Sequence, residues 1–164
     1  MRFILSLSGI LCSLYFNAQR PAAVSYIDSL VSSIDSAKNT ERSISCWWDR
    51  NAKPGKPFAR SIEYVFDTSL FYSGNKKLYR VVEDVINSNG TNVRYYYYQA
   101  NSLIKFREKQ SDTISGKPVF KNRTLYFFDN KFIYGDAEDS GGSENYKMIL
   151  KSSGKHVREF MKKF

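Results

Sequence analysis

The middle of the chain, from Ile44 to Tyr134, consists of short aromatic and β-branched runs separated by turn residues. This pattern is typical of β-strands joined by hairpins. Asn89-Gly90 and Asp129-Asn130 each stand between two runs, and both dipeptides favour tight turns. The pattern predicts six or seven strands in an antiparallel meander. A half-open roll and a small barrel both satisfy it.

Helical periodicity flanks the meander on both sides. After Pro21, apolar residues recur at three- and four-residue spacing as far as Ile34, which predicts an N-terminal amphipathic helix. A second apolar stripe runs from Tyr146 to Phe164, and Gly154 is a point where this C-terminal helix could divide. The whole pattern predicts a single α+β domain over residues 19–164, with one or both helices covering one face of the sheet.

Residues 1–18 have a different character. Arg2 precedes an apolar run from Phe3 to Phe16, and Asn17-Ala18-Gln19 follows. A cationic start, a short apolar segment and a small residue before the cut are features of a secretory signal peptide, and the run is too short for a stable membrane span. We expect these residues to be removed. The mature protein would then be exported, periplasmic or secreted, with no transmembrane segment.

Cysteine usage gives a further expectation. Cys12 lies in the expected signal peptide, so Cys46 would be the only thiol of the mature protein and could form no internal disulfide. Strand alternation places Ile44, Cys46 and Trp48 on one face, which predicts a buried cysteine and a core tryptophan. An exposed thiol that pairs or reacts is the alternative.

The chain is strongly basic, with a formal net charge of +9. This excess favours anionic partners, such as an acidic glycan, the envelope surface or an acidic protein, although solubility alone would also explain it. There is no specific nucleic-acid motif. There is also no Gly-rich phosphate loop and no dinucleotide fingerprint, so no cofactor is expected.

No metal site is expected either. His156 is the only histidine, and with one mature cysteine it cannot form an ordinary Cys/His zinc site. The acidic loop from Asp136 to Glu144 fails the calcium pattern, because Lys147 stands where the bidentate glutamate should be. We interpret His156 as a surface or helix-packing residue.

Four consecutive tyrosines, Tyr95 to Tyr98, form the most unusual run. In a strand they divide into two pairs on opposite faces, one expected in the core and one on the surface. The candidate surface combines aromatic rings with cations and suits stacking on sugar rings or bases and contact with anions, whereas ordinary cross-strand pairing is the alternative. Its candidate binding residues are Arg94, Tyr96, Tyr98, Lys105 and Arg107.

Two further surfaces are candidates for binding. Trp47 should point away from the core and, with Arg50 in the following loop, could form a second aromatic and cationic patch. In the last helix, cations recur at four- or three-residue steps and form one basic stripe, which could dock an anionic surface or simply be solvated. We define the basic stripe as Lys147, Lys151, Lys155, Arg158 and Lys162.

Carboxylates on candidate strands could instead serve a hydrolase. Glu83 shares its side of a strand with apolar neighbours, so it is the carboxylate expected to be partly desolvated. A cluster of Glu83, Glu108 and Arg107 in a deep pocket would favour hydrolysis. No set of residues is assigned as catalytic.

These observations favour an exported, non-enzymatic binding or interaction protein. Its basic, aromatic-rich surface would engage an anionic, glycan or protein partner. A small secreted hydrolase that uses sheet carboxylates is one alternative. An inhibitor or immunity-type partner protein is another.

Overall fold

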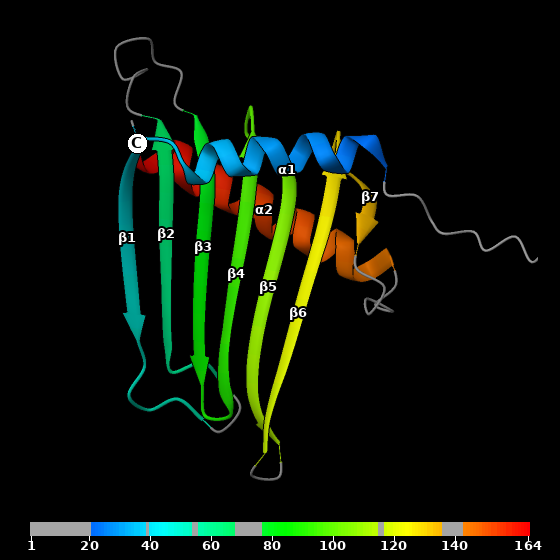
Figure 1. The fold of residues 1–164 in the computed structure, drawn as a ribbon. Helices are drawn as coiled ribbons and strands as arrows, with labels where there is room; N and C mark the ends of the chain where they lie inside the picture. Colours follow the sequence, from blue (N-terminus) through cyan, green and yellow to red (C-terminus); the bar gives the residue numbers. More distant parts are fainter. Residues whose placement is uncertain (1–20, 39, 54–55, 68–76, 115–116, 136–142) are drawn as a thin grey trace, which may run out of the picture.

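The computed structural model describes residues 21–38, 40–53, 56–67, 77–114, 117–135 and 143–164. Within them, seven strands form one sheet flanked by two helices (Figure 1). The proposed signal peptide lies outside the described residues, as does the acidic loop over 136–142. The elements are α1 (Ala22–Asp35), β1 (Thr40–Trp48), β2 (Ala59–Asp67), β3 (Leu78–Asn87), β4 (Gly90–Gln99), β5 (Ser102–Ile114), β6 (Lys117–Phe128), β7 (Lys131–Gly135) and α2 (Ser143–Lys163).

The sheet is an antiparallel meander in which every strand pairs with its neighbour in sequence. The predicted hairpin at Asp129-Asn130 is confirmed, and both residues have positive φ, as a tight primed turn requires. Ala100-Asn101 makes the same kind of turn between β4 and β5. Because β1 and β7 form the two edges, the sheet is open, and the small-barrel alternative is wrong.

The two helices lie on opposite faces of the sheet, with α1 in front of the strands and α2 behind them in Figure 1. α1 buries Val24 and Ile27 against Tyr97, Ile104 and Tyr126. α2 packs on the opposite face. Both helices cover one end of the strands, whose other halves extend past them toward the β3–β4 and β5–β6 hairpins (Figure 1).

Beneath α2, one apolar side chain from each of five adjacent strands lies at matching register. We call this set the apolar row: Tyr64, Val81, Tyr96, Phe106 and Leu125. All five are buried, and Ile149 and Phe160 of α2 belong to the same core cluster. Burying a large apolar side chain contributes roughly 1.5–3 kcal/mol, so this row is a major source of stability.

The tyrosine run differs from expectation. Tyr96 and Tyr98 are only 2% and 0% exposed, so the prediction that they form an open binding surface is wrong. Tyr97 is equally buried, but under α1. A strand sandwiched between two helices is buried on both faces, so alternation alone could not identify a wet side.

The expectation that Lys105 is a surface binding residue is also wrong, because its side chain is buried. The Lys105 ammonium lies 2.6 Å from Asp28 of α1 and faces the ring of Tyr126. Because the ion pair joins the helix to the sheet, Lys105 serves docking of α1 and is not available to a ligand.

The predictions for β1 are wrong for a related reason. Ile44 is 62% exposed, Trp48 is 69% exposed and Cys46 is exposed, although alternation suggested that all three are core residues. β1 is an edge strand, and the face that carries them remains open to solvent. Alternation does place them on one face, but it does not reveal which faces are covered.

The helix α2 runs without a break through Gly154, contrary to the division considered above. A Cβ atom added to Gly154 would meet only the end of Arg158, at an ordinary 3.5 Å. At Gly90 it would lie 1.8 Å from the carbonyl oxygen of Ser111, because β4 and β5 approach closely there. The same substitution should therefore have opposite effects at the two positions.

We predict that Gly154→Ala stabilises the protein by about 0.5–1 kcal/mol, because alanine is the better helix former. Gly90→Ala should destabilise it by about 2 kcal/mol or more, because backbone must move to admit the methyl group. Urea denaturation measures both free energies of unfolding. Equal effects from the two variants would contradict the close approach of β4 and β5.

Candidate functional site

Next to the apolar row, on the same face of the sheet, lies a row of charged side chains. Glu83, Arg94, Glu108 and Arg123 occupy matching register positions on β3 to β6, two residues from the apolar row. Arg60 of β2 lies diagonally beside Glu83. We call these five residues the charged row. Its signs alternate from strand to strand, which is the favourable cross-strand arrangement.

Glu83 is held from both sides. The side chain is 6% exposed, and its Oε1 lies 2.5 Å from Nη2 of Arg60. Its Oε2 lies 3.5 Å from Nη1 of Arg94 and accepts a 3.5 Å hydrogen bond from the hydroxyl of Tyr96. The expectation that Glu83 is desolvated is confirmed. A buried carboxylate needs such partners, because an unpaired buried charge is costly.

Glu108 is bound in a similar way by its neighbours. Its Oε1 accepts hydrogen bonds from Arg94 and Asn92, and its Oε2 accepts one from Arg123, each at 2.8 Å. Burial alone would raise the pKa of Glu108, but the hydrogen bonds from Arg94 and Asn92 hold it below its ordinary value. Glu108 therefore serves as an ionised anchor for two arginines.

A cleft of about 410 Å³ opens between α2 and this part of the sheet, and we call it the α2 cleft. Three cations from β2, β4 and α2 reach it, whereas Glu83 is the one carboxylate among the described lining residues. The arginines remain partly open, with 37% of the Arg60 and 36% of the Arg94 side chain exposed. The lining consists of Pro57, Arg60, Glu83, Val85, Arg94, Ser152, Lys155 and His156.

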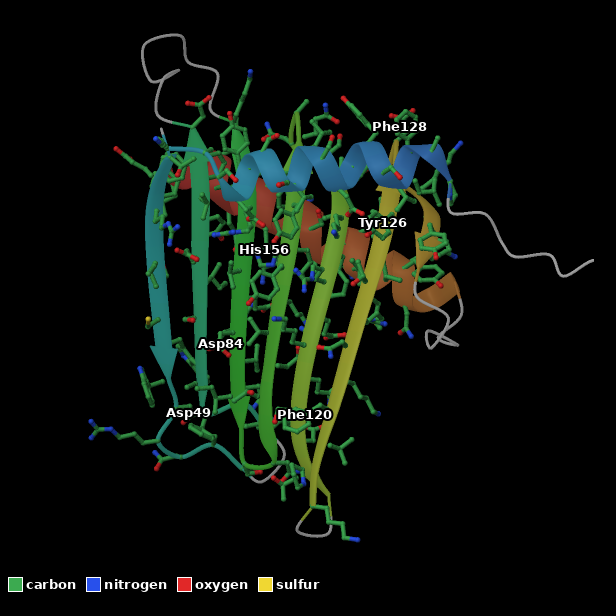
Figure 2. All side chains as sticks on the ribbon, viewed as in Figure 1. Asp49, Asp84, Phe120, Tyr126, Phe128 and His156 are labelled. Atoms are coloured by element: carbon green, nitrogen blue, oxygen red, sulfur yellow. The ribbon has the colours of Figure 1, made fainter. Side chains whose placement is uncertain are left out.

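His156 lies at the inner wall of this cleft and is labelled in Figure 2. It is 2% exposed, and its ring meets that of Tyr96 edge-on at 4.9 Å. Its Nδ1 has no hydrogen-bond partner within the described part of the chain. Burial lowers the pKa of the imidazole, so the ring is neutral at pH 7.

The structure brings only some of the expected binding residues together. Arg94 and Lys155 line the α2 cleft. Trp47 is 51% exposed and lies directly opposite Arg60, which also lines this cleft. Arg50 is exposed and lines a separate cavity with Trp48. The other members of the basic stripe are exposed on α2: Lys147, Lys151, Arg158 and Lys162.

The cluster that would favour a hydrolase does not form. Arg107 is the register partner of Tyr95, on the face opposite to Glu83 and Glu108. Glu108 does not line the α2 cleft. In the described residues there is no group of three or more histidine, cysteine or acidic side chains that could hold a metal, and no helix is long and apolar enough to cross a membrane.

Arg60 was not singled out from the sequence, whereas His156 was interpreted as a surface or helix-packing residue, and its burial against Tyr96 agrees with the packing alternative. Each position carried a further signal. Arg60 is in phase with Ile62 and Tyr64, which placed a cation on the buried face of its strand. His156 falls in helical phase with Ile149 and Phe160, on the apolar stripe. A polar side chain in an apolar phase indicated an unusual environment in both cases.

The buried histidine should make stability depend on pH. Because the native state holds a proton on His156 less tightly than the unfolded chain, its contribution is complete above about pH 6.5 and is lost as pH falls below that value. We expect His156→Phe to remove this loss, which amounts to at most about 1.4 kcal/mol per pH unit. Urea midpoints at pH 7 and pH 5 measure it. Parallel losses in both proteins would contradict burial of the imidazole.

No protein-family model matches the chain, and neither a search of curated proteins nor one of solved structures finds a match. What the protein does is therefore inferred from the shape and charges of the α2 cleft. Guanidinium and ammonium groups around a partly enclosed space are suited to anion recognition.

Proposed function

We propose that this is an exported, non-enzymatic binding protein that holds an anionic group of its ligand in the α2 cleft. The observation that carries the proposal is the meeting of Arg60, Arg94 and Lys155 around one cleft. Glu83, Glu108 and Glu159 pair with these cations, and Arg123 joins the same network through Glu108, so four cations face three carboxylates. The space therefore keeps a net positive charge. Export is inferred from the signal peptide expected at residues 1–18.

The two arginines are positioned before a ligand arrives. Glu83 contacts Arg60 and Arg94, and Glu108 holds the Nε of Arg94. These contacts restrict both guanidinium groups, so less side-chain entropy is lost when they bind an anion. A guanidinium has five N–H donors, and donors not used by the glutamates can bind a carboxylate, sulfate or phosphate oxygen.

Lys155 would complete the site from the helix. Its side chain is 59% exposed, and its contact with Glu159 is a long 3.7 Å. Exposed ion pairs of this kind contribute little, so the ammonium can turn toward a ligand at small cost. Lys155 also belongs to the basic stripe, whose field would attract anions toward the mouth of the cleft.

The hydrolase alternative is less well supported. A carboxylate that attacks a substrate or transfers a proton must be able to reach it. Glu83 and Glu108 each already bind two arginines. Their arrangement favours holding cations in place over chemistry on a substrate.

We predict that Lys155→Ala weakens sulfate binding about tenfold, because one charge-assisted contact is lost. Lys147→Ala is the matched control: it removes the same charge from the same helix, but Lys147 does not line the cleft. Isothermal titration with sodium sulfate at constant ionic strength measures both affinities. The control should change affinity less than twofold.

A second variant, Arg60→Gln, tests the site from the sheet side and should weaken sulfate binding at least as much as Lys155→Ala. Equal losses from Lys147→Ala and Lys155→Ala would show that only the net charge of α2 matters. That result would contradict a site in the α2 cleft.

A further inference from the structure

A second cavity of about 540 Å³ lies beside the α2 cleft, next to β1, and we call it the β1 cleft. Pro57 and Arg60 line both cavities, so the two adjoin at these residues, and we call the pair of cavities the groove. The remaining lining of the β1 cleft comes from β1, β2 and the loop between them: Ser45, Cys46, Trp47, Asp49, Lys56 and Ile62. A ligand in the α2 cleft can therefore extend toward the edge of the sheet.

The register fixes the length of this groove. Trp47 is directly opposite Arg60, Arg60 contacts Glu83, and Glu83 is directly opposite Arg94. These side chains come from four adjacent strands, which are spaced about 4.8 Å apart, so the groove spans about 14 Å. A sulfate ion or a single carboxylate would fill only one end of it.

The β1 cleft also has two cations in its lining, Arg60 and Lys56, but it differs from the α2 cleft in its aromatic surface. Trp47 supplies a large apolar ring that is 51% exposed, and Ile62 adds apolar surface. Asp49 accepts a hydrogen bond from the backbone N–H of Asn51, and a carboxylate can accept several more. Ser45 adds a hydroxyl group, whose oxygen accepts a hydrogen bond from Lys163 at 3.2 Å and keeps a second lone pair. An apolar ring beside groups that accept hydrogen bonds from hydroxyls is suited to a sugar, which has apolar C–H faces and polar edges.

We propose that the ligand is an acidic saccharide, with a sugar ring stacked on Trp47 and its carboxylate or sulfate between Arg60, Arg94 and Lys155. This inference rests on the proposed function, because it assigns the anionic group to the α2 cleft. It adds the chemical class of the ligand and a second point of recognition. Asp49 and Ser45 receive the hydroxyl groups next to the stacked ring.

The chain provides a matched control for Trp47. Trp48 is the next residue, is also exposed, and points to the opposite face of β1, where it lines a different cavity that shares Asp49 with the β1 cleft. Both side chains are open to solvent, so Trp47→Ala and Trp48→Ala should both fold, which thermal melts verify. Trp47→Phe keeps an aromatic ring in the groove and serves as the rescue variant.

The experiment compares an oligogalacturonate hexasaccharide, its methyl ester, a sulfated heparin hexasaccharide and inorganic sulfate by isothermal titration. We expect at least one acidic hexasaccharide to bind at least tenfold more tightly than both the methyl ester and sulfate.

Trp47→Ala should weaken that binding about tenfold, as expected for loss of one stacked ring. Trp47→Phe should restore most of it, and Trp48→Ala should change it less than twofold. Sulfate affinity should be the same in all three variants.

Two results would overturn the inference and leave the proposed function intact. One is that neither acidic hexasaccharide binds more tightly than sulfate. The other is that Trp47→Ala and Trp48→Ala cause equal losses. A failure of sulfate itself to bind the wild-type protein would instead overturn the anion site, and the saccharide proposal with it.

Discussion

The ion pairs of Glu83 with Arg60 and Arg94 mark where the core beneath α2 ends. Tyr96 and the rest of the apolar row lie under α2. Two residues farther along the same strands, on the same face, lies the charged row. A carboxylate at this boundary loses most of its water, so it requires cations and a hydroxyl donor close by. The alternation of sign across β2 to β6 meets that requirement and leaves cations facing the α2 cleft.

The same contacts link stability to the proposed binding. Glu83 and Glu108 hold the arginines against the sheet, and a restrained guanidinium recognises an oxyanion at a lower entropic cost than a mobile one. The cleft keeps its positive charge because Lys155 approaches from α2. The buried, neutral His156 closes the inner wall without adding another charge. Anchoring and recognition thus depend on one network.

Local pattern was sufficient for much of the fold but not for the site. Period-2 runs and turn residues predicted the meander and the hairpin at Asp129-Asn130. The apolar residues on the same side of the strand predicted the burial of Glu83. Two tertiary facts were beyond local pattern: β1 is an edge strand, and helices cover both faces of the central strands. For that reason Trp48 was wrongly placed in the core and Tyr96 on the surface. The meeting of Arg60 with Lys155 depends on how α2 crosses the sheet, which no local spacing encodes.

The location of a bound anion is the most direct test of this account. Crystals soaked in selenate, an isostere of sulfate, give an anomalous signal that places the ion without reference to any assumed site. The account predicts selenate within hydrogen-bond distance of Arg60, Arg94 and Lys155. Selenate found only along the outer lysines of α2, with the α2 cleft unoccupied, would contradict it.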